Sequence, residues 1–323
     1  MKRFRKLISW LLMAAFFFYV FRYFSENSQE LNKISEVNLS DVLKIGFLYV
    51  LTLFVSGYFT KLILDNFEVN LSLKKYFHLT VVTTLFNMLM PMRAGSGIKA
   101  IYLKKQCRLN YSLFVSSLAG SYILNFLVIG LSGLMASCFL YFHVGVSDVI
   151  TQIAFLTTVL GMLFLIVVPP SLLRPIVGFF PKQVASVLEG WNKLKKNKIL
   201  LIKLCGLTFM NTLLGSGIMY YGLLAVNVEC SLMELIYLTS VNGIISFINI
   251  TPAGVGVVET MMIFVARNLE ITTSDILLMS LVTRSATFAA NFVLFPICLY
   301  ALFGQSWKGQ LETLTGKTIQ STE

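Results

Sequence analysis

Four charged side chains stand inside or beside long apolar stretches of this 323-residue sequence: Arg93, Lys99, Glu259 and Arg284. A charge at the centre of a membrane-spanning helix costs about 2.5 to 3.5 kcal/mol on insertion scales, so each such group needs a partner or a water-filled cavity. An Arg or Lys without a local acid suits phosphate or another anion, whereas an Arg near a Glu forms an ion pair. These residue types therefore indicate an anion-binding site and a buried pair.

Two short segments rich in Gly and interrupted by Pro carry three of these charges. One reads "PMRAGSGIK" from Pro91, and the other reads "INITPAGVGVVE" and ends at Glu259. Pro ends a helix and Gly permits close backbone approach, so each segment predicts a helix break. We expect the breaks to involve Pro91, Gly97, Thr251, Pro252, Gly254 and Gly256. Each segment contains G-x-G, but neither has the dinucleotide or P-loop pattern, so nucleotide binding is not expected.

The first break predicts a phosphate site. Arg93 lies beside the exposed amides of a Gly-rich turn, and Lys99 follows it without a local acid. We therefore assign substrate binding to Arg93, Lys99, Asn87 and Gly95. The alternatives are a cytoplasmic loop that follows the positive-inside bias, a Lys99 that reaches to the surface, and an Asn87 that bonds between helices.

The second break predicts an ion pair. Glu259 lies seven residues beyond Pro252, and Arg284 lies ten residues into the last apolar run. Ten residues at 1.5 Å per residue is about 15 Å, which places Arg284 near the bilayer centre. The pair is interpreted either as a gate or as a structural clamp, and the sequence leaves both open.

No catalytic constellation, metal site or cofactor is predicted. His78 and His143 are far apart, and the five Cys are scattered without a C-x-x-C pair. No nucleophile has an evident base. We predict that the chain is not an enzyme, and a membrane-embedded, metal-dependent transferase remains an alternative.

The composition predicts an all-α, polytopic membrane protein. The chain is 56% hydrophobic and only 13% charged, which excludes an ordinary soluble domain. The net charge of +11 comes from Lys and Arg in loops between apolar runs, which is typical of the positive-inside bias and not of nucleic-acid binding. We expect the plasma (inner) membrane, with both termini cytoplasmic.

Apolar runs of sufficient length predict six full spans. They cover about 7–24, 43–64, 111–141, 149–173, 199–225 and 274–303. Two further regions, 76–108 and 232–268, each hold an apolar arm, a break and a shorter arm. Aligning Pro91 with Pro252 places Gly95 on Gly256, at an offset of 161 that is half the chain length. This spacing indicates an internal duplication.

The loop charges predict that the two halves are inverted. Loop 25–42 is acidic and expected outside, whereas the first broken region ends in Lys104, Lys105 and Arg108 and is expected inside. Each half then holds three full spans and one re-entrant hairpin, and the odd count reverses the second half. The predicted parts are a first repeat at 1–173, a cytoplasmic amphipathic linker at 174–198 and a second repeat at 199–323. The alternative is ten ordinary spans.

The two break motifs resemble a known family. "PMRAGSGIKAIYL", and "NITPAGVGVVET" followed by "VTRSATF", are similar to the lysylphosphatidylglycerol synthase transmembrane domain family, also called flippase-like. Its pattern is P-x-R-x-G in the first half and T-P-x-G-x-G-x-x-E in the second, with an Arg in the next span. By that resemblance the motif positions are Pro91, Arg93, Gly95, Thr251, Pro252, Gly254, Gly256, Glu259 and Arg284. Ser96 departs from the pattern, because an acid often follows that Gly in the family.

The resemblance implies lipid translocation. We expect a stand-alone member without the soluble synthase domain, so lysyl transfer is not expected. The basic first break favours a lipid with an anionic headgroup, either a phospholipid or a polyprenyl-linked lipid. The alternative function is an accessory protein that transports nothing and binds a glycolipid or cell-envelope biosynthesis enzyme.

Overall fold

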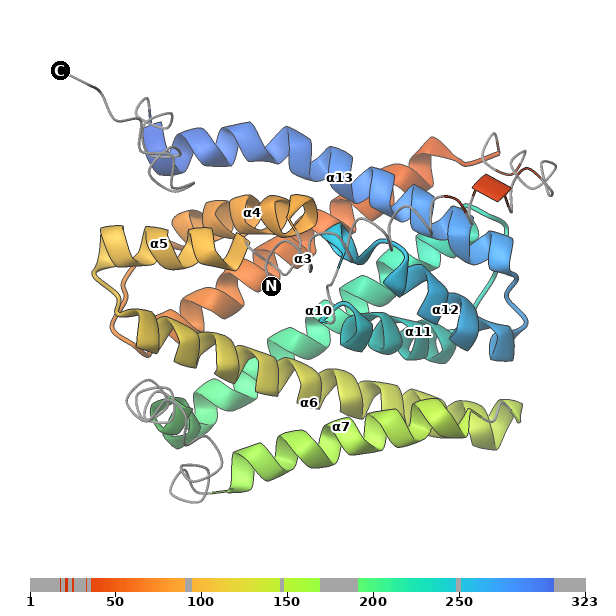
Figure 1. Cartoon of the computed structure of the whole chain (residues 1–323), viewed down its shortest axis with the longest axis horizontal. Coiled ribbons are helices and arrows are strands. Elements are labelled where there is room, and N and C mark those ends of the chain that lie inside the picture. Colours follow the sequence, from red (N-terminus) through yellow and green to blue (C-terminus); the bar gives the residue numbers. More distant parts are fainter. Residues whose placement is uncertain are drawn as a thin grey trace.

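The computed structural model describes residues 36–90, 95–145, 148–168, 191–247 and 251–304, together with Phe18, Phe21, Arg22, Ser25 and Lys33. All regular secondary structure in these ranges is helical (Figure 1). Most of the predicted first span, most of the predicted linker 174–198 and the end of the chain lie outside the described residues.

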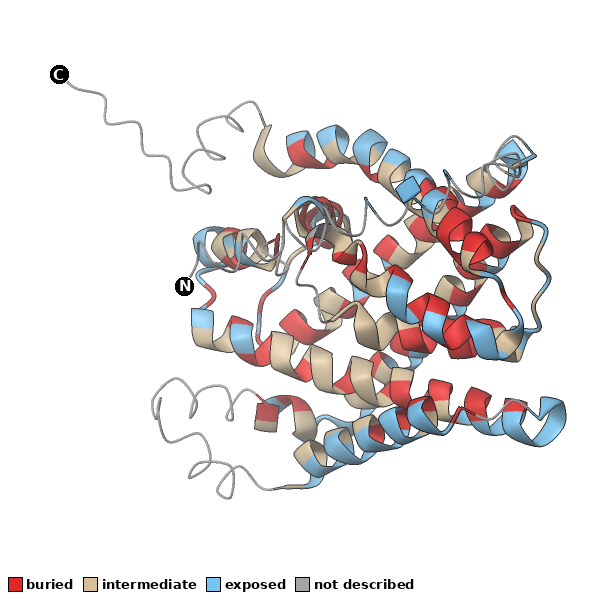
Figure 2. Cartoon of the chain, turned by 45° about the vertical axis from the view of Figure 1, so that its right-hand side comes forward, coloured by how far each residue is buried: buried red, intermediate tan, exposed pale blue. Residues whose placement is uncertain are grey.

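Five long helices are apolar enough to cross a membrane, which confirms the prediction of an all-α polytopic protein. They are α3 (Leu39–Asp65), α6 (Tyr111–Val144), α7 (Val149–Val167), α10 (Lys198–Leu224) and α13 (Thr273–Phe303). They coincide with predicted spans two to six. Ile153, Leu160 and Phe164 of α7 are exposed, as expected of a surface that meets lipid. Figure 2 shows that exposed residues recur along this helix.

Side chains at the helix ends fix where these helices begin. Asn38 caps α3, and its side chain accepts a hydrogen bond from the backbone N–H of Ser40 at 2.9 Å. Asp148 caps α7 in the same way, and Gly145 ends α6 with φ of 77°. Such caps satisfy the amides that the first helical turn leaves unpaired.

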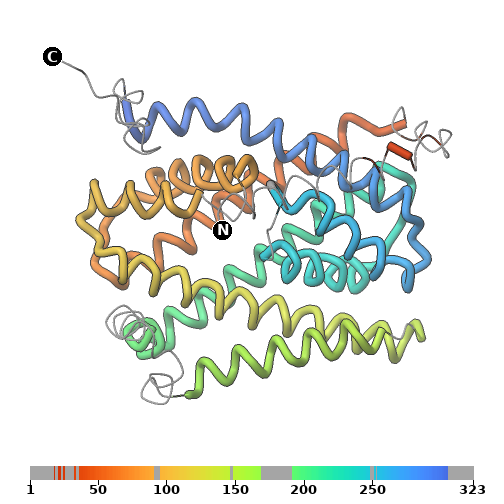
Figure 3. The backbone as a smooth tube through the Cα atoms, in the orientation of Figure 1, coloured from red at the N-terminus to blue at the C-terminus, as the bar shows by residue number. Residues whose placement is uncertain are grey.

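Two pairs of short helices are broken in the interior of the molecule. The first pair is α4 (Leu73–Leu89) and α5 (Gly95–Cys107). The second is α11 (Leu232–Ile245) and α12 (Val257–Ala266), with the short helix η3 (Pro252–Gly254) between them. Each pair runs to the middle and turns back, and the two pairs come from opposite ends (Figures 1 and 3).

The element spacing reveals the repeat. The number of residues from the start of α3 to the start of α10 equals the number from the start of α4 to the start of α11. The start of α12 follows the start of α5 by a slightly larger number of residues, and the start of α13 follows the start of α6 by that same number. Equivalent helices run in opposite directions in Figure 1. The repeats also exchange partners, because α3 packs on α10, α4 packs on α13 and α6 packs on α11.

The described part of the chain contains two similar units, α3–α6 and α10–α13. Each unit holds two long helices and one broken pair, and α7 lies between the units in the chain. The predicted division into three spans and one hairpin per half includes the first span and so stays a prediction.

Clusters of apolar side chains stabilise each repeat and the contact between the two repeats. One cluster surrounds Leu223, Tyr237 and Ile276 in the second repeat. Another surrounds Tyr76 and Leu103 in the first. A third joins α3, α4 and α13 near the break residues.

Candidate functional site

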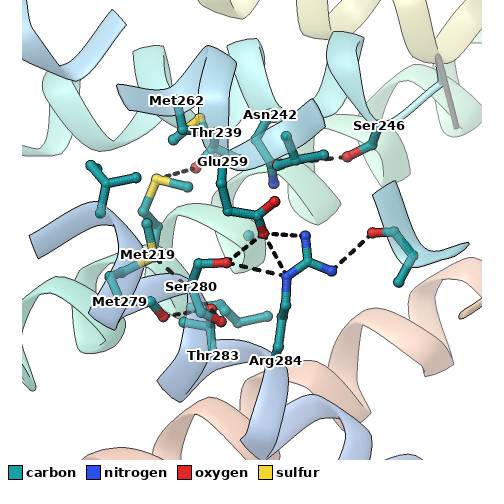
Figure 4. Close-up of a pocket in the computed structure, with 15 residues that line it drawn as sticks. Met219, Thr239, Asn242, Ser246, Glu259, Met262, Met279, Ser280, Thr283 and Arg284 are labelled. Atoms are coloured by element: carbon teal, nitrogen blue, oxygen red, sulfur yellow. Dashed lines mark hydrogen bonds and ion pairs between the residues drawn. The ribbon is translucent and has the colours of Figure 1, made fainter. Parts of the chain in front are cut away.

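A cavity of about 280 Å³ lies where the second break meets α10 and α13 (Figure 4). Helices α10, α11, α12 and α13 all contribute to its wall. Its polar lining includes Thr239, Asn242, Ser246, Ser280, Thr283 and Arg284. Met219, Met262 and Met279 supply flexible apolar surface beside them, which adapts to ligand shape.

Glu259 is the buried acid of this site, with only 2% of its surface exposed. As the third residue of α12, its Oε2 accepts a hydrogen bond from the backbone N–H of Gly256 at 2.7 Å. Its Oε1 accepts one from the Ser280 hydroxyl at 2.7 Å. The carboxylate thus caps its own helix and bonds to α13 at the same time.

Arg284 on α13 neutralises this carboxylate. Its Nε donates to Glu259 Oε1 at 2.8 Å, and its Nη2 forms an ion pair with the same oxygen. Its Nη1 donates to the Ala253 carbonyl at 2.9 Å. A guanidinium has five N–H donors, and these contacts engage three of them, while the side chain is 25% exposed. Among the described residues, the other two N–H donors of Arg284 make no hydrogen bond.

The break itself is a left-handed turn. Ala253, Gly254 and Gly256 have φ of 52°, 70° and 87°. A non-Gly residue in this region is strained, and Arg284 binds the carbonyl of that residue, Ala253. The buried Thr251 closes the turn, because its hydroxyl donates to the Val255 carbonyl at 2.8 Å.

The first break is built on a close backbone approach. A Cβ on Gly95 would lie 2.2 Å from the Thr83 carbonyl oxygen and 2.7 Å from Asn87 Oδ1. Only Gly fits there, so α5 starts against α4. The Asn87 Oδ1 atom is buried and has no hydrogen-bond partner among the described residues.

Of the four residues predicted to bind phosphate, the structure describes Asn87, Gly95 and Lys99. Asn87 and Gly95 contact each other, whereas Lys99 Nζ donates to the Thr60 hydroxyl of α3 at 2.9 Å. Arg93 and Pro91 lie outside the described residues. Gly97 was predicted in the break, but it is the third residue of α5 and faces open space, because Gly95 makes the close approach.

The polar wall formed by α11 and α13 was missed by the sequence analysis. Thr239, Asn242, Ser246 and Thr283 were not predicted as site residues. A signal was present, because Thr239, Asn242 and Ser246 are spaced i, i+3 and i+7 on one helical face.

The site supplies hydrogen bonds and a neutralised ion pair. Its donors are the remaining guanidinium N–H groups, a side-chain amide and several hydroxyls, which suit a polar headgroup. Within the described ranges, no three His, Cys, Asp or Glu side chains gather as a metal site.

A family model described as the lysylphosphatidylglycerol synthase TM region matches residues 6–294. The match covers both breaks and Arg284. No curated protein matches the chain.

Proposed function

Because the chain belongs to the family of the lysylphosphatidylglycerol synthase TM region, whose members are membrane proteins with a role in lipid handling, we propose that it moves a phosphate-bearing lipid between the two leaflets. The observation that carries the proposal is the polar cavity at the second break, which is lined by α10, α11, η3, α12 and α13 and lies beside the contact of η3 with α4 of the first pair. Transporters commonly place their substrate sites at such breaks.

The lengths of the broken helices support a re-entrant arrangement. α4, α5, α11 and α12 have 17, 13, 14 and 10 residues. At 1.5 Å per residue they extend about 15 to 26 Å, less than the roughly 30 Å of a hydrocarbon core. Each pair therefore enters and leaves on one side, in preference to the ten-span alternative.

The cavity volume supports binding of a headgroup and not of a whole lipid. Pockets for drug-sized ligands hold about 300 to 1,000 Å³. A cavity of about 280 Å³ accommodates a phosphate with a small polar substituent, while the acyl chains stay in the bilayer. Arg284 offers its remaining N–H donors to the phosphate. Because its charge is already neutralised by Glu259, it does not hold the phosphate too strongly for the headgroup to leave. In this proposal Arg93 receives the lipid phosphate at the first break, and the Glu259–Arg284 pair is the gate on the other side.

A leaflet-exchange assay tests the proposal. The purified protein is reconstituted into vesicles that carry fluorescent phosphatidylglycerol in both leaflets, and dithionite bleaches the outer leaflet. Translocation exposes the inner-leaflet probe as well. The informative variant is Thr283→Val, which removes a cavity hydroxyl at nearly constant shape. Thr287→Val is the matched control, because Thr287 lies one turn further along α13, bonds to its own helix in the same way and does not line the cavity.

We expect Thr283→Val to slow exchange by about three- to tenfold, the loss of one hydrogen bond, and Thr287→Val to match the wild type. If the wild-type protein leaves the inner-leaflet probe protected, translocation is overturned in favour of the accessory protein. If both variants behave as wild type, lipid does not use this cavity.

A further inference from the structure

A second, much smaller cavity lies in the first repeat, between α3, α5 and α6. Its volume is about 20 Å³, enough for about one water molecule. Lys99, Thr60, Ser117 and Ser121 supply its polar lining. Among the described residues, no carboxylate lies within ion-pair distance of Lys99, which donates a hydrogen bond to the Thr60 hydroxyl.

The repeat spacing relates this cavity to the large one. Aligning the start of α3 with the start of α10 places Thr60 on Met219, and both residues line a cavity. Aligning the start of α6 with that of α13 places four lining residues of the small cavity on lining residues of the large one. These pairs are Phe114 with Ile276, Ser117 with Met279, Leu118 with Ser280, and Ser121 with Thr283. The two cavities are therefore the same site in two inverted repeats, one open and one nearly closed.

The charge of the two sites differs. The alignment that relates α5 to α12 and α6 to α13 puts Gly97 in the place of Glu259 and Tyr122 in the place of Arg284. The large cavity thus contains a neutralised pair, whereas the small one contains a single ammonium group with donors to spare. A lone, partly buried ammonium is matched by an anion.

We propose that the Lys99 cavity is a second site for an anionic, phosphate-bearing headgroup, which opens in an alternate conformation as the large cavity closes. This inference rests on the proposed function and deepens it. The inverted repeats direct the two cavities toward opposite ends of the molecule, so the alternation presents the headgroup first to one leaflet and then to the other. The open and the nearly closed form of the cavity are both compatible with this fold, since one repeat has the open form and the other has the closed form.

Thiol accessibility at a repeat-related pair of positions tests this. Ser121→Cys and Thr283→Cys are made in a chain whose five Cys are replaced by Ala, and each is reconstituted in phosphatidylcholine vesicles with or without phosphatidylglycerol. The rate of reaction with a small methanethiosulfonate is measured. We expect Ser121→Cys to react about 10- to 1,000-fold more slowly than Thr283→Cys in phosphatidylcholine, as for a minor conformation.

Phosphatidylglycerol should protect Ser121→Cys by filling the Lys99 site, and should also slow Thr283→Cys as the large cavity closes. Adding Lys99→Gln should weaken the protection about tenfold or more, because an ammonium–phosphate bond is lost. Lys104→Gln is the matched control on the same helix. It removes the same charge near Tyr111, outside the cavity.

Two outcomes would overturn the inference: a Ser121→Cys thiol that reacts in no lipid, or protection that Lys99→Gln leaves unchanged. The leaflet-exchange assay on the same vesicles separates the two proposals. Exchange without lipid-dependent protection refutes the second site and leaves translocation standing. Protection that depends on Lys99 without exchange supports the second site and refutes translocation.

Discussion

Glu259 binds three different parts of the chain, and this explains why a carboxylate is tolerated at such depth. It caps α12, accepts from Ser280 and pairs with Arg284, which in turn binds the strained Ala253. Every contact spans the break or crosses to α13. These contacts join the break, α12 and α13 to one another, so a movement of any one of these parts would change them.

At this residue scale the two partners should not be equivalent. Arg284→Gln leaves a buried carboxylate without its cation and should lower the free energy of unfolding by about 3 kcal/mol. Glu259→Gln should cost less, since Gln also caps a helix at this position and the partly exposed Arg284 is solvated by the cavity. Thermal unfolding of the purified proteins in detergent measures both. The double variant should recover part of the Arg284→Gln loss, and equal small losses would contradict the clamp.

Two glycines of the α4–α5 pair offer a matched test at the scale of elements. Gly95→Ala places a Cβ 2.2 Å from the Thr83 carbonyl oxygen, so the helices must separate, at a cost of about 1 to 3 kcal/mol. Gly97→Ala meets no atom within 4 Å and should stabilise α5 by up to about 1 kcal/mol. The melting temperatures of the two variants in detergent decide this, and a shift in the same direction for both would refute the close approach.

The loop between α6 and α7 is tied to the second broken pair by Asp148. Tyr237 of α11 donates its hydroxyl proton to Asp148 Oδ2 at 2.8 Å, and the Thr151 hydroxyl donates to the same atom at 2.5 Å. Burial opposes ionisation of Asp148, but these hydrogen bonds outweigh it and hold the pKa of its carboxyl below the usual value. The folded state therefore favours the ionised form of the Asp148 carboxyl.

This lowered pKa predicts how stability depends on acid. A carboxyl whose pKa is depressed by folding contributes stability fully above its unfolded pKa of about 3.9, and the contribution is lost as pH falls through the folded pKa. Asp148→Asn should be less stable at neutral pH and should flatten the acid limb of a plot of melting temperature against pH. Glu229→Gln, at an exposed loop position, is the control for charge. If the melting temperature of Asp148→Asn falls with acid as steeply as that of the wild type, Asp148 does not stabilise the contact between the α6–α7 loop and α11.

Much of this arrangement could be predicted from the sequence, for identifiable reasons. The long helices follow from apolar runs, and the breaks from Pro and Gly within them. The contact of Glu259 with Arg284 was foreseeable because a charge in an apolar run needs a partner. The polar wall could not be predicted, since the sequence does not show whether Asn242 and Thr239 bond between helices or line a cavity. Gly97 was misplaced because either glycine of G-x-G could make the close approach.

At the scale of the whole molecule, the exchanged partners of the repeats matter most. Each broken pair packs on a long helix of the other repeat, α4 on α13 and α11 on α6, and α4 also contacts η3. A movement that closes one cavity is thus transmitted directly to the other repeat. Few identities link the repeats, so this exchange follows only from the three-dimensional arrangement.

The depth of the breaks distinguishes opposed hairpins from ten ordinary spans. Single Cys are placed at Asn70 and Asn227, exposed positions at opposite ends of the molecule, and at Met90, the cap of α4 next to the first break. A bulky, membrane-impermeant maleimide should label Asn70→Cys and Asn227→Cys from opposite sides of the membrane. It should reach Met90→Cys from neither side, because in the re-entrant arrangement α4 ends within the membrane. In a ten-span protein, Met90 would lie in a surface loop and label as fast as Asn227→Cys, from the same side. That result would remove the re-entrant pairs on which the proposed exchange depends.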